Sequence, residues 1–76
     1  MIKEHDSIVL LQDLPKDGLK VGDMGTVVHI HKGAAGYEVE FMTLAGETIA
    51  VTTLLAAQVR PIAKGDVAHV RELQSA

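Results

Sequence analysis

The chain has 76 residues, of which 47 % are hydrophobic and 22 % charged, and its formal net charge is −3. This length leaves no room for a second domain, the high hydrophobic content excludes disorder, and the interspersed charges exclude a membrane-spanning segment. The sequence has no cysteine, which excludes a disulfide framework and a thiolate zinc site, so self-association is the remaining way to reinforce a small core.

The first strand is expected at Asp6–Leu11, a short run with β-branched residues whose two faces are both apolar. A turn-rich loop follows, in which Pro15 fixes φ and Asp17–Gly18 favours a reversal of the chain. Gly22 and Gly25 can both adopt positive φ, so a sharp bend is expected immediately before the next strand.

The second strand is expected at Thr26–Ile30, which is rich in β-branched residues. Side chains alternate between the two faces of a strand. Thr26, Val28 and Ile30 are predicted to share one face, with Val28 and Ile30 in the core. Val27, His29 and His31 are predicted to point outward.

Two more strands are expected after a hairpin connection at Lys32–Gly36. Tyr37–Met42 shows the clearest alternation of the chain. Its core side chains are predicted to be Tyr37, Val39 and Phe41, with Glu38 and Glu40 facing water. Glu47–Thr52 predicts a fourth strand, with Ile49 and Val51 pointing inward.

The remaining sequence predicts one short strand and an extension. Thr53–Ala57 favours a single helical or 3₁₀ turn, and Gln58–Ile62 a last strand, which Pro61 confines to an edge or a bulge because proline donates no N–H. For residues 63–76 three alternatives stay open: a helix with Asp66 as its N-cap, an extra strand, or a tail.

Short strands joined by sharp corners predict an all-β chain, a small five-stranded SH3-like barrel over residues 1–62. The C-terminal extension, residues 63–76, is expected to pack on the barrel or at an oligomer interface, as a helical turn or an extra strand.

The chain also resembles a family of short, functionally uncharacterised bacterial proteins with an SH3-like barrel. The resemblance covers Met1 to Ile62 and rests on Asp6–Leu10, Asp13–Pro15, Gly18–Val28, Tyr37–Phe41 and Val59–Pro61. Gly22–Val27 alone is similar to the KOW-type loop of ribosomal and transcription-factor barrels. The resemblance implies the fold, and it implies no activity, cofactor or functional residue.

His29 and His31 are two residues apart on one strand, so both imidazoles project from one face at a spacing that can chelate a metal ion. Depending on the hairpin register, Glu38 or Glu40 lies opposite a histidine. We expect ordinary cross-strand polar pairs here, because the sequence does not identify a definite third metal ligand or the outer residues that would orient the histidines. No cofactor is therefore predicted.

No recognisable catalytic constellation occurs, so we expect a non-enzymatic binding module. The chain has more aliphatic side chains than so small a barrel can bury, and such an excess marks a contact surface. The predicted interaction surface is Val27, Leu54, Leu55, Val67, Val70 and Leu73, and the predicted binding loop contains Pro15, Gly18, Gly22, Asp23 and Gly25. The expected partner is another protein or a second copy, so a homo-oligomer is predicted.

Two alternatives stay open beside this prediction. One is a KOW-like nucleic-acid or ribosome-associated module that uses Lys16, Lys20 and Lys32, although the net negative charge and the two aromatic residues disfavour nucleic acid. The other is a weak metal binder through His29 and His31. The first residues lack the features of a secretory signal, so a cytoplasmic location without a membrane partner is expected.

Overall fold

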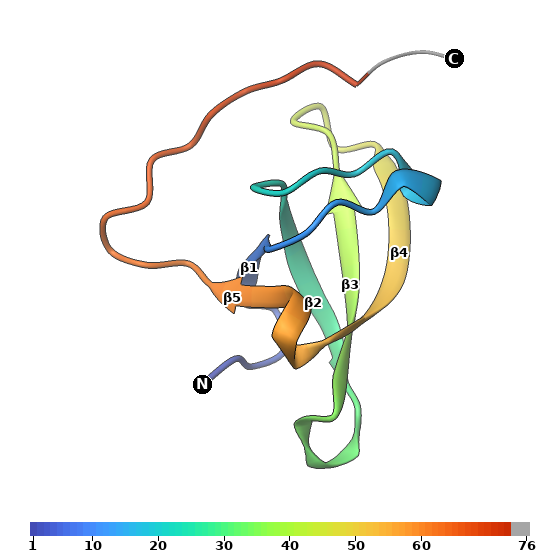
Figure 1. Ribbon diagram of the computed structural model, residues 1–76, viewed down its shortest axis with the longest axis vertical. Coiled ribbons are helices and arrows are strands. Elements are labelled where there is room, and N and C mark those ends of the chain that lie inside the picture. Colours follow the sequence, from blue (N-terminus) through green and yellow to red (C-terminus); the bar gives the residue numbers. More distant parts are fainter. Residues whose placement is uncertain (74–76) are drawn as a thin grey trace.

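Residues 1–73, which the computed structural model describes, form five strands in one antiparallel sheet (Figure 1). The strands are β1 (Ser7–Leu10), β2 (Met24–Ile30), β3 (Gly36–Met42), β4 (Thr48–Leu55) and β5 (Val59–Pro61). Three 3₁₀ turns lie between them: η1 (Pro15–Asp17), η2 (Lys32–Ala34) and η3 (Ala56–Gln58). The strand order is β4-β3-β2-β1-β5. The prediction of an all-β chain with five strands is confirmed.

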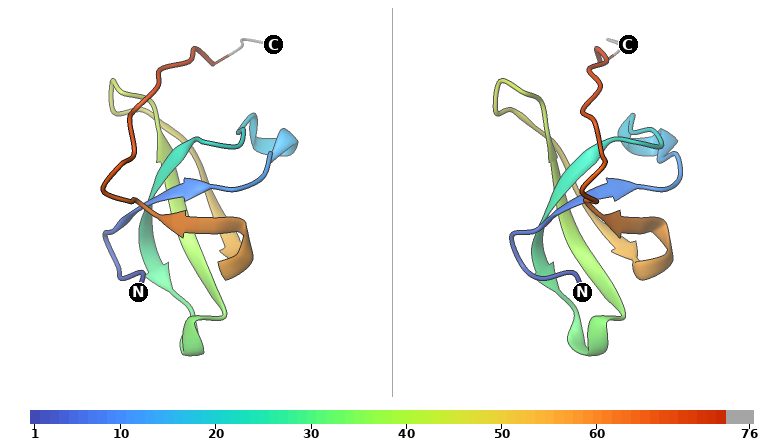
Figure 2. Two further views of the ribbon diagram at one scale, coloured as in Figure 1. Left: turned by 60° about the vertical axis from the view of Figure 1, so that its left-hand side comes forward. Right: turned by 90° about the vertical axis from the view of Figure 1, so that its left-hand side faces the viewer.

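The sheet is strongly curved, so that β1 and β5 cross over β2, β3 and β4 (Figures 1 and 2). A single hydrophobic core lies inside this curve. Its buried members are Ile8, Leu10, Leu19, Val27, Tyr37, Val39, Phe41, Leu54 and Val59, so every strand contributes to it. The outermost strands, β4 and β5, do not pair with each other within the described residues and are linked by η3.

Several core predictions are confirmed. Both faces of β1 are buried, because Ile8, Val9 and Leu10 are all at most 9 % exposed. The β3 side chains predicted to point inward are buried as well. β5 is an edge strand, as the missing N–H of Pro61 requires.

A β-bulge in β2 changes which valine reaches the core. Val27 pairs with Val39, and the next pair is His29 with Glu38, so Val28 is the extra residue. Val27 is 0 % exposed and Val28 is 40 % exposed. The predictions that Val28 points into the core and that Val27 lies on the surface are therefore wrong.

The inward face of β4 also differs from the prediction. The strand continues to Leu55, through a segment predicted to be a turn, and its register shifts opposite the Phe41–Met42 step. Leu54 is 1 % exposed, whereas Val51 is 56 % exposed. The inward placement of Val51 and the surface placement of Leu54 are therefore wrong. Ile49 is partly buried against the core, as predicted.

Glycine is needed at two positions near β2 for two different reasons. Gly22 has φ of 92°, in the left-handed region, and makes the predicted bend. Gly25 is not among the glycines with positive φ. A Cβ there would lie 2.5 Å from Val39 Cγ1 and 2.9 Å from Phe41 Cε1. The predicted role of Gly25 in the bend is wrong, and its absent side chain instead allows β2 to approach the core side chains of β3.

The C-terminal segment does not form the expected helix or strand. Within residues 62–73 there is only a turn at Lys64–Gly65, and the chain leaves β5, swings away from the sheet and returns toward the opposite end of the molecule (Figure 1). Residues 74–76 of the predicted extension lie outside the described residues. The carboxylate of Asp66 does not cap a helix. It binds Arg60, and it also accepts the backbone N–H of Ala63.

Candidate interaction surface

The predicted interaction surface divides into two groups. Val27 and Leu54 are buried in the core and therefore do not belong to the surface. The other four side chains are exposed: Leu55 (61 %), Val67 (90 %), Val70 (69 %) and Leu73 (43 %). Leu55 lies at the end of β4, while the remaining three lie in the C-terminal segment. The structure therefore places three of the four exposed members of the predicted surface outside the strands.

An ion pair fixes the beginning of the C-terminal segment. Arg60, in β5, donates from Nη1 to Asp66 Oδ2 and from Nη2 to Asp66 Oδ1, both at 2.9 Å. Asp66 also accepts the N–H of Ala63 at 2.6 Å. The Arg60 hydrogen bonds, followed by the Ala63 N–H, lower the pKa of the Asp66 carboxyl to about 2. The pair is bidentate, a geometry that fixes orientation as well as distance.

A second ion pair fixes the far end of the segment to the first loop. Arg71 donates from Nε to Asp23 Oδ1 at 2.9 Å and from Nη2 to the carbonyl oxygen of Gly18 at 3.1 Å. Asp23 also accepts the Lys20 N–H at 2.9 Å. Burial raises the pKa of the Asp23 carboxyl, but the hydrogen bonds from Arg71 and Lys20 outweigh burial, and the pKa is lowered. Asp23 was predicted in the binding loop, and its partner Arg71 was not predicted.

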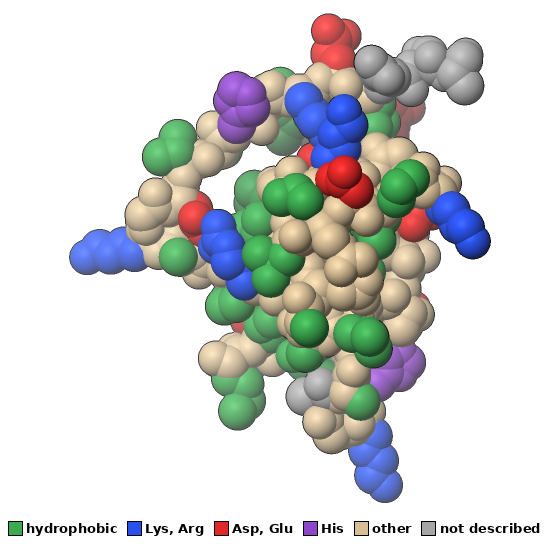
Figure 3. Space-filling model, in the orientation of Figure 1, with side chains coloured by type: hydrophobic (Ala, Val, Ile, Leu, Met, Phe, Trp, Pro, Cys, Tyr) green, Lys and Arg blue, Asp and Glu red, His purple; other side chains and the backbone are tan. Residues whose placement is uncertain are grey.

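Between these two pairs the chain stands away from the sheet, and we call residues 63–71 the arch (Figures 2 and 3). Val67 and Val70 lie on the arch and are among the most exposed aliphatic side chains of the described residues. His69 lies between them and is also exposed. The arch has no hydrogen-bonded secondary structure beyond its first turn, so the two ion pairs are its main attachments among residues 1–73.

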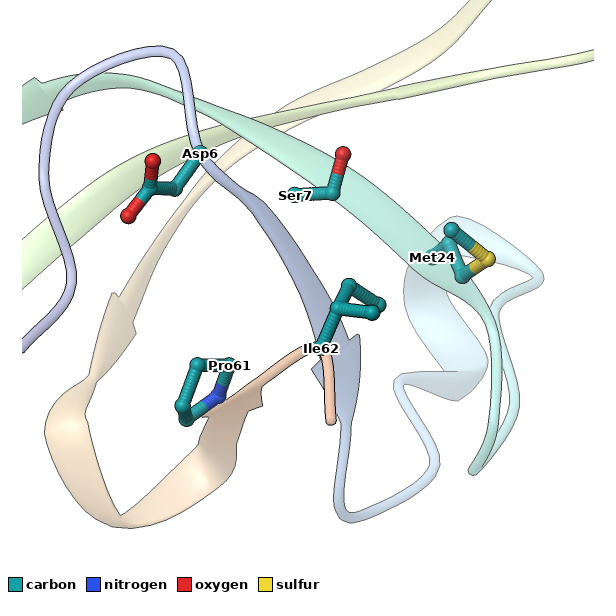
Figure 4. Close-up of a pocket in the computed structure, with 5 residues that line it drawn as sticks. All are labelled: Asp6, Ser7, Met24, Pro61 and Ile62. Carbon is teal, nitrogen blue, oxygen red and sulfur yellow. The ribbon is translucent and has the colours of Figure 1, made fainter. Parts of the chain in front are cut away.

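A shallow pocket of mixed polar and apolar lining lies beside the start of the arch, where β1 begins and β5 ends (Figure 4). It has a volume of about 460 Å³ and is lined by Asp6, Ser7, Met24, Pro61 and Ile62. Hydrophobic side chains gather over β1, β2 and β5 in this region (Figure 3). Met24 is 49 % exposed and Ile62 40 % exposed, so the apolar surface continues from the sheet toward the arch.

A second pocket, also of about 460 Å³, lies where the far end of the arch meets the first loop. Its lining residues are Asp13, Pro15, Asp17, Gly18, Leu19, Lys20, Ile49, Arg71 and Leu73. The loop residues Pro15 and Gly18 therefore lie together with Leu73. Gly22 and Asp23 shape the same loop, whereas Gly25 faces the core.

The candidate metal ligands lie on the outer face of β2 and β3. His31 Nε2 is 2.7 Å from Glu38 Oε2, and the Thr53 hydroxyl donates to the same oxygen. The Thr53 hydrogen bond, and next the His31 hydrogen bond, lower the pKa of the Glu38 carboxyl. Glu40 is engaged elsewhere, because it accepts the Thr48 hydroxyl at 2.6 Å.

His29 completes this face. Its ring lies edge-on to His31 with 5.4 Å between ring centroids, and its Nδ1 is 3.7 Å from Glu4 Oε2. No group of three or more histidine, aspartate or glutamate side chains in residues 1–73 is arranged to hold a metal ion. What the geometry shows is a polar pair across the hairpin, between His31 and Glu38.

The lysines of the nucleic-acid alternative are divided between two ends of the molecule. Lys16 lies in η1 and Lys20 in the first loop, whereas Lys32 lies in η2, at the tip of the β2–β3 hairpin (Figure 1). They do not form one basic patch. No helix in the described part of the chain has the length and hydropathy needed to cross a membrane.

Comparison with known protein families matches residues 4–61 to a domain of unknown function, DUF4926. The match spans all five strands and ends at the last residue of β5, before the arch begins. No curated protein and no solved structure matches the chain. Because the match covers well over half of the sequence, the chain belongs to the DUF4926 family.

Proposed function

We propose that this chain is a small non-enzymatic module that binds a protein partner through the aliphatic side chains of its arch. One observation carries the proposal: Val67 and Val70 are 90 % and 69 % exposed on a segment that arginine–aspartate pairs hold at both ends. A single exposed valine is ordinary on a protein surface. Two exposed valines on a segment that is fixed at both ends form an apolar surface whose backbone conformation is already restricted.

The two ion pairs favour binding by reducing the conformational entropy that the segment would lose when a partner binds. A free tail loses backbone and side-chain entropy when a partner orders it, and that loss weakens binding. Here the Arg60–Asp66 and Arg71–Asp23 pairs already restrict the segment before a partner arrives. The arch therefore presents its valines with less entropy left to lose than an untethered tail of the same sequence.

The neighbouring surface supports the same function. The pocket lined by Met24 and Ile62 adjoins the start of the arch (Figure 4), and both of these side chains are exposed. A partner that contacts Val67 can extend onto this pocket and bury apolar area on both sides of the Arg60–Asp66 pair. Buried apolar area with a polar rim is the usual composition of protein interfaces.

The two alternatives have weaker support. The separation of Lys32 from Lys16 and Lys20 deprives a nucleic acid of the clustered cations that release counterions on binding. His31 is hydrogen-bonded to Glu38, so a metal ion would have to displace that contact. The cytoplasmic location expected from the sequence stays a prediction.

The test is cross-linking in the native cell with a photoreactive amino acid at position 67. A matched probe replaces Lys32, which is exposed but lies at the hairpin tip away from the arch. We expect a discrete protein adduct from position 67 only, and its loss when Arg71→Met releases the arch. The same adduct from both positions, no protein adduct at position 67, or an adduct with nucleic acid would overturn the proposal.

A further inference from the structure

We propose that the free edge of β4 is a self-association site at which a second copy of the chain adds its own β4, antiparallel and about a two-fold axis. β4 pairs only with β3 among the described strands and forms the margin of the sheet in Figure 1. This site is separate from the arch, so either proposal can fail without the other.

The pairing scheme shows which backbone groups of β4 are free. Gly36 directs its carbonyl toward β2, because it accepts the N–H of His31 at 2.9 Å. In an antiparallel sheet the direction alternates along the strand, so Tyr37, Val39 and Phe41 face β4. Their partners in β4 are Leu54, Thr52 and Ala50. The N–H and C=O groups of the intervening residues, Val51, Thr53 and Leu55, therefore point to the free edge.

The two edges of the sheet are protected to different degrees. β5 is three residues long, contains Pro61 and carries the Arg60–Asp66 pair, and these features hinder the addition of a strand. β4 is eight residues long and has no charged residue and no proline. An edge with these properties is a template for pairing with another strand. The sequence therefore blocks one edge and leaves the other available.

The exposed side chains of β4 match a second copy of themselves. Val51 is 56 % exposed, Leu55 is 61 % exposed, and the exposed Thr53 lies midway between them. With the two-fold axis at Thr53, each Val51 lies opposite Leu55 of the other copy, and Thr53 lies opposite Thr53. The pattern is self-complementary, as an isologous interface requires. The Leu55 N–H is already held by Gln58 Oε1 at 2.7 Å, so the new ladder ends there.

β4 itself contributes no charge to this pairing. The nearest acidic side chains in the sheet, Glu38 and Glu40, lie on β3, one strand in from the edge. Across the proposed interface the two β3 strands are separated by three strand spacings, about 14 Å. The Glu38 carboxylate extends to the Thr53 hydroxyl, so the two Glu38 carboxylates lie closer together than their strands, on the solvent-facing side of the sheet where water and salt weaken their repulsion.

The first test is sedimentation equilibrium of the whole chain from micromolar to millimolar concentration. We expect a monomer–dimer equilibrium without larger species, because two-fold pairing uses up the only long free edge of the described residues. Val51→Lys and Leu55→Glu should each shift the chain to monomer, since each places one charge opposite an aliphatic group. The double variant should recover the dimer, because Lys and Glu then face each other in both pairs.

The two substituted side chains are more than half exposed, so the variants should keep the circular dichroism spectrum of the parent. Val67→Asp, in the arch, is the matched control and should leave the dimer unchanged. A second measurement is amide hydrogen exchange: the Thr53 N–H should gain protection with concentration, whereas the Thr52 N–H, which faces β3, should not change. A monomer at all concentrations, no recovery in the double variant, or a dimer lost with Val67→Asp would overturn the proposal.

Discussion

The bulge in β2 leads to a prediction that separates two adjacent valines. Val27→Thr and Val28→Thr are the same chemical change, from a methyl to a hydroxyl of nearly equal size, in neighbouring positions of one strand. Valine and threonine are both β-branched, so local strand preference changes little in either variant. Any difference in stability between the variants therefore reports where each side chain lies.

The structure sets the size of that difference. Val27 is 0 % exposed and packs in a core whose buried side chains are hydrophobic, with no buried polar group among the described residues, so a hydroxyl there has few candidate partners. Burying an unpaired hydroxyl costs about 1–3 kcal/mol. Val28 is 40 % exposed, and its hydroxyl reaches water. A surface change of this kind stays within about 0.5 kcal/mol.

The assay is urea unfolding of the two variants and the parent, followed by circular dichroism. For a domain of this size 1 kcal/mol corresponds to about 4–8 °C in Tm, so a thermal scan gives an independent measure. We expect Val27→Thr to be clearly less stable than Val28→Thr. Equal losses, or a larger loss for Val28→Thr, would refute the bulge and restore the alternation that the sequence alone suggests.

Three further outcomes can be measured. Gly25→Ala should lower the free energy of unfolding by about 1–3 kcal/mol through overpacking, because its Cβ would lie 2.5 Å from a core methyl, whereas Gly65→Ala meets no atom within 4 Å and should be nearly neutral in urea unfolding. Leu54→Ala should cost about 2–5 kcal/mol in the same assay, and a loss under about 0.5 kcal/mol would show that Leu54 lies on the surface. The Asp66 carboxyl has its pKa lowered from 3.8 to about 2, so its stabilising pair with Arg60 is complete above about pH 4 and is lost as the pH falls toward 2. Arg60→Gln should return the pKa of Asp66 toward 3.8 in an NMR titration, and an unchanged value would show that Arg60 is not its partner.

The strand pattern was predictable where polar and apolar residues alternate without ambiguity. In β3, Glu38 and Glu40 separate Tyr37, Val39 and Phe41, so only one face can enter the core. In β2, valines occupy consecutive positions, and either phase satisfies the alternation. The bulge is set by pairing with β3, which a local pattern does not contain. One extra residue then exchanges the two faces.

β4 was mispredicted for a related reason. Threonine and aliphatic residues occur on both of its faces, so the sequence gives no polar marker of the outer side. The register shift beside Phe41 decides that Leu54 is buried and Val51 is exposed. The sequence shows Leu54 and Leu55 as two adjacent leucines, and only the register assigns one to the core and the other to the edge.

The ion pairs that hold the arch could not be predicted from local sequence patterns. Arg71 and Asp23 are 48 residues apart, and no periodicity links two such positions. The Arg60–Asp66 pair is nearer in sequence, but Asp66 was expected to cap a helix, whereas its carboxylate accepts the Ala63 N–H in a turn and binds Arg60. The residues around Asp66 do not indicate which arginine it pairs with.

The arrangement of charge on the sheet favours contacts at the two proposed sites, the arch and the β4 edge, over contacts on the sheet face. Glu38 and Glu40 occupy the outer face of β3 as carboxylates, and Thr53 and Thr48 of β4 each donate a hydroxyl to one of them. Stacking another sheet on this face would remove from water two carboxylates whose hydrogen-bond partners are threonine hydroxyls and the His31 imidazole, which is unfavourable. Strand addition at β4 leaves both carboxylates hydrated, because the side chain of Thr53 serves Glu38 while its backbone N–H and C=O point to the edge. The same residue therefore keeps the face polar and the edge available for pairing.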